Sequence, residues 1–480
     1  MERKSKDSIR RKKRNEILRV VLVISAAGTM VFQYRLLWAL AMVLGYYVIR
    51  EAFLSDHIFY PVQADYEYIL SPHWRFPVTV QYVIDSGAVP DTVDTLLLTV
   101  RFRCQALGYL RDPWVEIHSK EIHYRQYFER GVGGLRYINL TNLVQDAEGN
   151  RTRPGLATLS FHHCMAEDGG ELLGFCNAVS SHSRVLVIAP HADDAELAAF
   201  GVYSSHASMI VTLTAGEIEA ENFQTVEPDL VKASRLKGQL RSNDSVAAGV
   251  WGGVPAENIV SLGYFCKQLQ AMHSLPDESV PSLTAAVSDS RFFRRYNRIL
   301  LASDVHGTAS WNSLLGDLRE LVALHKPDVI ITPHPVLDPH PDHLYATRAL
   351  VEALGETAAP VIFLLYANHY HNTQMAPFGP AHSSVGLPPG NQPSATALGA
   401  YARVLADDVQ QHKAMALQMM HDLRKTPTLA KRLRPFLQKW LAGRPETVYG
   451  ADAFFRRAVR LHEVFFVANL SALRQLLKEV

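Results

Sequence analysis

The chain has 480 residues, of which 48% are apolar and 20% are charged. This composition excludes a largely disordered protein, and the length exceeds the roughly 100–200 residues of a usual domain, so we expect two or three folded units. Forty-eight basic residues stand against 47 acidic ones, and the resulting net charge of +1 argues against a nucleic-acid partner.

A basic leader opens the chain and is followed by two apolar runs. The leader is residues 1–16, with the cluster Arg-Arg-Lys-Lys-Arg at 10–14, and the apolar runs cover 17–32 and 36–49. As one helix, residues 17–50 would be about 50 Å long, which exceeds a hydrocarbon core of roughly 30 Å. We therefore expect residues 17–50 to bind the lipid bilayer as a transmembrane hairpin. An anchor with one spanning and one interfacial run is the alternative.

The basic leader predicts a cytoplasmic N-terminus. A hairpin would return the rest of the chain to the cytoplasm, whereas a single span would place it on the other side. The sequence thus predicts a membrane protein, of the bacterial inner-membrane type, and leaves the side of the soluble part open. Two buried helices of a soluble protein are disfavoured because the leader directly precedes the apolar runs.

Residues 59–180 have short apolar strands separated by turn-forming residues. Strand-like sequences occur at 78–84, 95–102 and 156–161, and the Gly-Val-Gly-Gly at 131–134 marks a turn. Regular short strands of this kind predict a β-sandwich-like domain. No group of catalytic residues stands out in it, so glycan binding and packing against the neighbouring domain are both open as its role.

From residue 183 to 480 the pattern changes to strands that alternate with helices. This alternation predicts an α/β domain with a mostly parallel, Rossmann-like sheet and flanking helices. The chain from Leu398 onward is expected to be helical and to pack against this domain. The strand sequences are residues 184–190, 209–214, 328–333 and 361–366.

The first of these strands runs directly into His-Ala-Asp-Asp at 191–194. A motif between a strand and a helix lies at the carboxyl edge of a parallel sheet, where open α/β folds bind ligands. A histidine and one carboxylate of this turn can reach a single metal ion, and the adjacent carboxylate stays free as a base. For this motif alone, capping of the following helix is an equally good explanation.

The third strand leads into a second motif at 334–343, which contains three histidines and two aspartates. Its prolines restrict the directions in which the imidazoles point. Both motifs follow strands that end at one edge of the sheet, so they can converge to supply two histidines and one carboxylate. Three ligands with an open position are typical of a catalytic zinc site, which disfavours a purely structural explanation of both motifs.

A strand ending in His-x-Asp-Asp, with a later His-Pro-Asp-His, resembles the PIG-L/LmbE-like family of zinc-dependent N-acetylglucosaminyl deacetylases. The resemblance extends over residues 183–380 and implies Zn²⁺, or another divalent transition metal, as the cofactor. It further implies that His191, Asp194 and His343 are the metal ligands.

The resemblance also implies roles in catalysis and substrate binding. Asp193 would be the general base, and His340 would stabilise the tetrahedral intermediate or protonate the leaving amine. Asp342 would orient a histidine from outside the ligand set. Arg241 resembles an arginine that lies near the substrate in the family, and residues 214–217 resemble its Thr-x-Gly-Glu turn.

Three positions depart from the family pattern. Ala192 stands where the family usually has proline, Ala195 stands where it has glutamate, and Phe200 precedes Gly201 where two glycines are usual. None of these positions is a metal ligand or the base. The departures therefore bear on the substrate and on close kinship rather than on the hydrolytic chemistry.

The sequence thus predicts a membrane-anchored hydrolase that removes the N-acetyl group of an N-acetylated sugar or glycoconjugate of the GlcNAc type. Two alternatives stay open: a zinc amidase acting on another acyl-amine, and a glycan-binding scaffold with a vestigial metal site. The intact ligand set and Asp193 argue against the scaffold.

Overall fold

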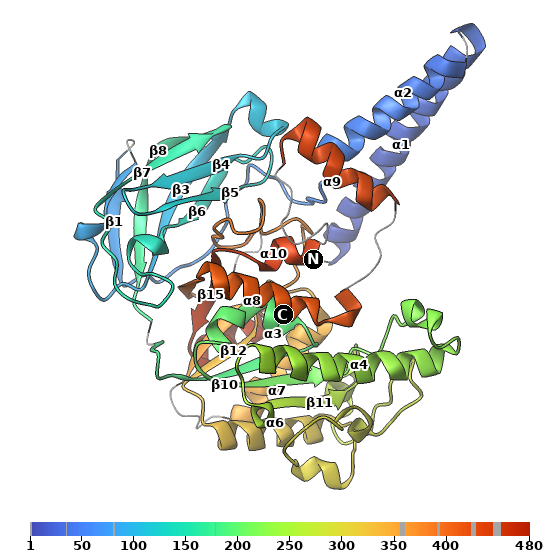
Figure 1. Ribbon diagram of the computed structural model, residues 1–480, viewed down its shortest axis with the longest axis vertical. Helices are drawn as coiled ribbons and strands as arrows, with labels where there is room; N and C mark the ends of the chain where they lie inside the picture. Colours follow the sequence, from blue (N-terminus) through green and yellow to red (C-terminus); the bar gives the residue numbers. More distant parts are fainter. Residues whose placement is uncertain are drawn as a thin grey trace.

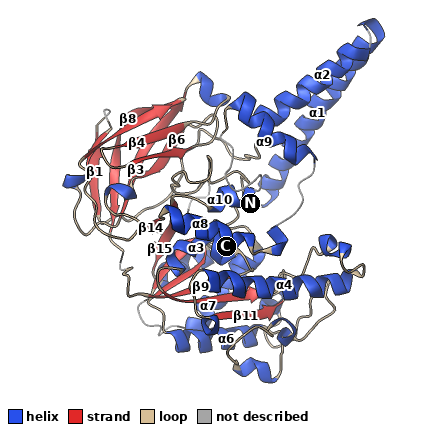
Figure 2. Ribbon diagram, in the orientation of Figure 1, coloured by secondary structure: helices blue, strands red, loops and turns tan. Residues whose placement is uncertain are grey.

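A helical hairpin, a β-sandwich and a larger α/β body make up the computed structural model (Figures 1 and 2). The mixed α/β class that the sequence predicts is confirmed. The structure describes residues 2–34, 36–79, 82–177, 179–355, 361–390, 394–423, 429–444 and 453–480.

The hairpin projects from the body, and its two helices lie side by side (Figure 1). It consists of α1 Glu2–Tyr34, α2 Leu36–Ile49 and a π-helical segment, Arg50–Leu54, that continues α2. Where the hairpin meets the body, Arg50 Nε donates to Glu16 Oε1 at 2.9 Å and joins the two helices. The stretch Leu36–Leu54 has the length and apolar composition needed to cross a membrane.

Two four-stranded antiparallel sheets form the β-sandwich, with strand orders β1-β8-β3-β6 and β2-β7-β4-β5. Leu96 and Leu98 of β3 share one apolar core with Val115 and Ile117 of β4, because alternate residues of each strand point inward. The strands are β1 Trp74–Val78, β2 Val83–Asp85, β3 Thr95–Cys104, β4 Trp114–His118, β5 His123–Tyr127, β6 Gly134–Asn139, β7 Leu156–His162 and β8 Cys164–Phe175.

The prediction of a single strand at 78–84 is wrong. The chain there leaves one sheet at Val78 and enters the other at Val83, and Tyr82 between them has a positive φ of 45°. A residue in the left-handed region ends strand geometry, so the apolar run is divided between the two layers.

A seven-stranded sheet with the order β11-β10-β9-β12-β13-β15-β14 forms the α/β body. The first five strands pair in parallel, and the last two join as antiparallel neighbours. Leu186 and Val187 of β9 enter different cores, so the sheet is buried on both faces. The strands are β9 Arg184–Ala189, β10 Ala207–Thr214, β11 Ile259–Tyr264, β12 Val329–Pro333, β13 Ile362–Tyr366, β14 Gly399–Val404 and β15 His462–Ala468.

Helices cover both faces of this sheet. Leu314 of α6, Ala346 of α7 and Leu473 of α11 belong to one core, and Ala195 of α3 and Ala414 of α8 belong to the other. The remaining helices are the long α4, the short α5 and α10, and α9 beside the hairpin (Figure 1). The bounds are α3 Asp194–Tyr203, α4 Leu230–Trp251, α5 Leu269–Ser274, α6 Trp311–His325, α7 Pro341–Leu354, α8 Asp407–Gln418, α9 Leu429–Ala442, α10 Ala453–Ala458 and α11 Leu470–Lys478.

The expectation of helices alone after Leu398 is wrong, because this part of the chain supplies β14 and β15. The run 464–467 is short, apolar on both faces and rich in valine and phenylalanine, which suits a buried strand. Its partner strands lie about 60 residues earlier in β14 and about 100 residues earlier in β13. The local sequence therefore does not predict that this run pairs as a strand.

Polar side chains cover the backbone at both edges of the seven-stranded sheet. At β14, the Thr95 hydroxyl oxygen from the sandwich accepts a hydrogen bond from the Ala402 N–H at 3.1 Å. At β11, the Asn297 amide accepts from the Ser261 N–H at 2.8 Å and donates to the Ser261 carbonyl at 2.9 Å. The sandwich therefore packs directly against the edge strand of the α/β body.

Candidate metal centre and active site

The two sequence motifs meet at the carboxyl ends of β9 and β12, where the strand order of the sheet reverses. His191 Nδ1 lies 3.2 Å from Asp194 Oδ2 and 3.3 Å from His343 Nε2. His343 Nε2 lies 3.2 Å from the same Asp194 oxygen. Zinc ligands bound tetrahedrally at about 2.0–2.1 Å are roughly 3.3 Å apart. The spacing of these three donor atoms therefore fits one metal ion.

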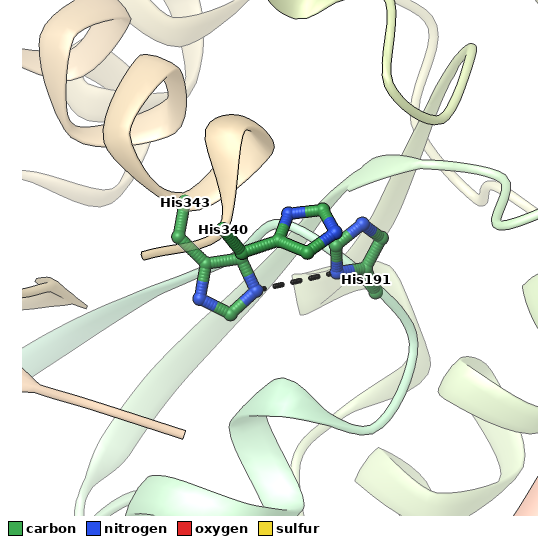
Figure 3. Close-up of side chains that lie close together, drawn as sticks. All are labelled: His191, His340 and His343. Atoms are coloured by element: carbon green, nitrogen blue, oxygen red, sulfur yellow. Dashed lines mark hydrogen bonds between the residues drawn. The ribbon is translucent and has the colours of Figure 1, made fainter. Parts of the chain in front are cut away.

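Each of the two histidine rings is held by a carboxylate on its other nitrogen. Asp342 Oδ2 lies 3.1 Å from His191 Nε2, and Asp338 Oδ2 lies 2.9 Å from His343 Nδ1. These contacts fix the rings so that His191 Nδ1 and His343 Nε2 face each other, as Figure 3 shows. Carboxylates in this position also make an imidazole a more basic metal ligand.

Asp194 is oriented by the loop that follows β13. Its Oδ1 accepts from Asn368 Nδ2 at 2.8 Å, and its Oδ2 accepts from the His191 N–H at 2.9 Å. Asn368 is itself fixed, since its N–H donates to Asp338 Oδ2 at 3.0 Å and its carbonyl accepts from Arg457 at 2.8 Å. A third strand end thus supports the same donor triangle.

Charge and burial make this triangle favourable for a cation. Burial acts to lower the pKa of His343, but Asp194 and Asp338 outweigh it and raise that pKa to about 10. Burial acts to raise the pKa of Asp194, yet His343 and His191 hold it well below its usual value. The surroundings therefore stabilise positive charge here, either as a proton or as a metal ion.

His340 lies beside the triangle and caps the helix that carries His343. Its Nδ1 accepts from the Asp342 N–H at 3.2 Å, so the neutral ring carries its hydrogen on Nε2. Burial, together with the neighbouring His191 and His343, lowers the pKa of His340 to about 4. Its ring centroid is 4.8 Å from that of His191 (Figure 3). The side chain is thus a neutral hydrogen-bond donor next to the candidate metal position.

Asp193 has a backbone conformation that residues other than glycine rarely adopt, with φ 143° and ψ −23°. Arg241 Nη2 donates to Asp193 Oδ1 at 3.2 Å and to the Ala192 carbonyl at 3.0 Å. Burial raises the pKa of Asp193 to about 6, and Arg241 opposes that rise. A strained carboxylate with a raised pKa beside a candidate metal site is characteristic of a functional residue.

Arg241 is enclosed by protein groups behind this carboxylate. Its Nη1 donates to Asp422 Oδ2 at 2.8 Å, and Lys237 Nζ lies 3.2 Å from the same oxygen. A Cβ added to Gly216, in the turn that resembles Thr-x-Gly-Glu, would lie 2.4 Å from Arg241 Nε, and Gly216 has a φ of +64°. These contacts assign Arg241 to the support of the site, and its role in binding substrate stays a prediction.

Sequence reasoning assigned no role at the metal position to Asp338, Asn368, His369 or Cys266. Two of these side chains lie close to the donor triangle. The His369 ring centroid is 5.1 Å from that of His343, and Cys266 Sγ is 3.5 Å from Asp342 Oδ2. Asn368 and Cys266 follow β13 and β11, so the rule that nominated the two motifs could have nominated these residues as well.

Comparison with solved structures adds little. The hydratase GalB for 4-carboxy-2-hydroxymuconate, from Pseudomonas putida KT2440, is 14% identical over 54% of this chain and 83% of that chain, with a TM-score of 0.29. A protein from Bacillus subtilis is 9% identical over 57% of this chain and 79% of that chain, with a TM-score of 0.18. No curated protein sequence matches this chain significantly.

The comparison with family models is informative. The PIG-L family, described as GlcNAc-PI de-N-acetylase, matches residues 186–354, a segment that contains both motifs. This match indicates an enzyme of the deacetylase type and confirms the resemblance on which the sequence analysis relied. Residues 186–354 of this chain therefore form a PIG-L family domain.

Proposed function

We propose that this protein is a membrane-anchored, metal-dependent deacetylase that hydrolyses the N-acetyl group of an N-acetylated sugar. The observation that carries the proposal is the donor triangle of His191 Nδ1, Asp194 Oδ2 and His343 Nε2, with sides of 3.2–3.3 Å. Two imidazoles and one carboxylate suit Zn²⁺ and leave a position open for substrate or water. All three residues lie in the segment that matches the PIG-L family.

His191, Asp194 and His343 would hold Zn²⁺ or another divalent transition metal. When bound, such an ion polarises a carbonyl and lowers the pKa of a water molecule. Asp342 accepts from His191 Nε2 and Asp338 accepts from His343 Nδ1, and these hydrogen bonds keep the two imidazoles in the required tautomers.

The remaining side chains would move the protons. Asp193 takes a proton from the attacking water and later passes it to the departing amine, because an amine leaves more readily when protonated. Arg241 keeps the carboxylate of Asp193 in place. The Nε2–H of His340 donates to the acetyl oxygen as negative charge develops there. The products are acetate and an amino sugar.

The hairpin favours a substrate at the membrane, such as a GlcNAc-type glycoconjugate or a polysaccharide precursor. Large apolar side chains of α2 are exposed, for example Leu37 at 76% and Trp38 at 67%, and a bilayer would cover them. Because the hairpin returns to the body beside α1, the N-terminus and the catalytic domain would lie on one side. The basic leader makes that side the cytoplasm.

The test is acetate release from N-acetylhexosamine conjugates by the full chain, with and without a chelator. We expect Asp193→Asn to retain its metal and to lose turnover, whereas the exposed Asp408→Asn serves as a control with unchanged activity. Full activity of metal-loaded Asp193→Asn would refute the assignment of the base. Full activity after complete removal of metal would refute metal dependence.

The same assay separates the alternatives. Hydrolysis of other acyl-amines without any attack on acetylated sugars would identify an amidase of different specificity. Glycan binding by metal-loaded protein that never releases acetate would favour the scaffold.

A further inference from the structure

Helix α9, Leu429–Ala442, presents an apolar stripe away from the protein. The stripe consists of Leu429, Leu433, Phe436 and Trp440. These residues are four, three and four positions apart, which places them on one face of the helix. Phe436 and Trp440 have ring centroids 6.3 Å apart along it. The exposed fractions are 73% for Leu429, 42% for Leu433, 59% for Phe436 and 70% for Trp440.

The opposite face of α9 is fixed to the base of the hairpin. Arg434 Nε lies 2.6 Å from Glu51 Oε2, and Glu51 is buried. Gln438 Nε2 donates to Ser55 Oγ at 3.1 Å. Figure 1 shows α9 beside the end of α2 that enters the body. The stripe therefore points outward because the polar face of α9 is already engaged.

A second contact fixes the end of α9. Arg444, which follows the helix, donates to Asp56 at 2.7 and 2.9 Å and to Asp112 of the sandwich at 2.8 and 2.9 Å. Arg130 also pairs with Asp112 at 2.8 Å. The orientation of the stripe is thus set relative to both the hairpin and the sandwich.

We propose that α9 is an interfacial helix whose apolar stripe inserts into the same bilayer that the hairpin enters. The proposal rests on the membrane anchoring stated under the proposed function. A lipid surface fits better than a protein partner because the helix that carries the stripe packs against the base of the hairpin, where the apolar side chain of Leu54 is also exposed, at 52%.

Insertion of α9 would give the protein a second attachment to the membrane. A hairpin alone can tilt in the bilayer together with the body that it carries. A helix lying in the interface, joined to the hairpin through Arg434 and to the sandwich through Arg444, removes that freedom. The catalytic edge of the sheet would then keep a constant height and direction relative to the lipid.

Tryptophan fluorescence of the full chain in vesicles of phosphatidylcholine and phosphatidylglycerol tests this proposal. The chain has six tryptophans, so single Trp→Phe variants isolate the signal of each by difference. Trp440 reports on the stripe and Trp38 on the hairpin. Trp251 in α4, 42% exposed, is the matched control for a side chain in water.

We expect brominated lipid to quench Trp440 and Trp38 but not Trp251, and acrylamide to quench Trp251 most. Phe436→Glu should abolish the quenching of Trp440 by brominated lipid and leave that of Trp38 unchanged. If Trp38 is quenched and Trp440 behaves like Trp251, the interfacial assignment is wrong. Protection of Trp440 from both quenchers would also overturn it, because a protein would then cover the stripe.

A failure of Trp38 to respond would overturn the anchor and this proposal together. Acetate release is measured on the same samples and does not depend on these signals. A failed interfacial helix is therefore distinguishable from a failed deacetylase.

Discussion

Two buried clusters of charge in this molecule differ in how completely their polar groups are paired. In the sandwich, Arg136 and Glu129 are fully buried, and Arg136 Nε donates to Glu129 Oε1 at 3.0 Å. The other nitrogens of Arg136 donate to the carbonyls of Val62 and Ala64, and the Tyr66 hydroxyl donates to Glu129. Opposite charges and carbonyls thus satisfy this cluster within the chain.

The cluster at the edge of the large sheet is arranged differently. His191, Asp194 and His343 direct three donor atoms at one another, although none of them carries a permanent positive charge. Asp342 Oδ1 is buried and has no hydrogen-bond partner among the residues that the structure describes. The Arg136–Glu129 cluster, in which every charge is paired, is therefore called the closed cluster, and it stabilises the fold. The cluster of His191, Asp194 and His343, whose donor atoms face one another, is called the open cluster, and it is suited to bind a ligand.

Removing a donor from the open cluster should have the largest effect. We expect His191→Ala and His343→Ala to lose metal and at least about 10³-fold in kcat/KM, because a metal contributes several kcal/mol to the transition state. Metal content per chain and acetate release measure this, with the exposed His182→Ala as the control. Variants that keep both metal and activity would remove the distinction between the clusters.

Breaking the closed cluster should reduce stability and spare the chemistry. Glu129→Ala leaves the buried guanidinium of Arg136 uncompensated, and we expect the free energy of unfolding to fall by about 3–5 kcal/mol. Glu171→Ala removes the exposed partner of Arg75 and should cost below about 1 kcal/mol. Urea unfolding of the full chain in detergent micelles compares the two. Equal losses would contradict the contrast.

Weakening the supports of the open cluster should have a smaller effect. Asp338→Asn and Asp342→Asn keep the shape of each side chain but remove its charge, and we expect a loss of about 10–100-fold in metal affinity. Competition with a chelator measures the affinity, and Asp328→Asn, on an exposed carboxylate, is the control. Unchanged affinity in both variants would show that these carboxylates do not support the ligands.

Near neutral pH, the smallest effect concerns a buried histidine at the junction of the two regions. His462 Nε2 donates to Asn142 Oδ1 at 2.6 Å, Nδ1 accepts from Ser384 Oγ at 3.1 Å, and burial lowers the pKa of His462 to about 3. Below its ordinary pKa of 6.5 the unfolded chain takes up a proton that the folded chain does not, so stability falls as the pH decreases.

Relative to His462→Gln, the wild type should lose about 1.4 kcal/mol of unfolding free energy for each pH unit below about 6.5, down to the lowered pKa. Urea titrations near neutral and mildly acidic pH give the two slopes. The exposed His182→Gln should keep the wild-type slope. Identical slopes for wild type and His462→Gln would exclude this histidine as the cause.

The sequence predicted elements whose signals are local. The strand before 191–194, the strand before 334–343 and the apolar runs of the hairpin are contiguous, and each appears in the structure. Residues that follow parallel strands lie at the same edge of the sheet, whatever the order of the strands. This was enough to predict that the two motifs lie close together.

What the sequence did not predict depends on distant partners. β14 and β15 become strands only because β13 offers an antiparallel edge, and the run at 78–84 is divided because the two sandwich sheets compete for it. Asn368 is an ordinary loop residue in sequence, and Asp338 belongs to the motif at 334–343 without a role that the sequence could assign. They gain their importance from contacts with Asp194 and His343 that only the folded chain creates.

The covered edges of the large sheet have a consequence if the protein is confined to a membrane, as proposed. Molecules confined to two dimensions collide often, and an open strand edge invites backbone pairing between copies. The Thr95 hydroxyl bonds the Ala402 N–H of β14, and the Asn297 amide bonds the Ser261 carbonyl of β11. These backbone groups are therefore not available for such pairing. The sandwich at the β14 edge and the Asn297 loop at the β11 edge therefore oppose self-association of the large sheet.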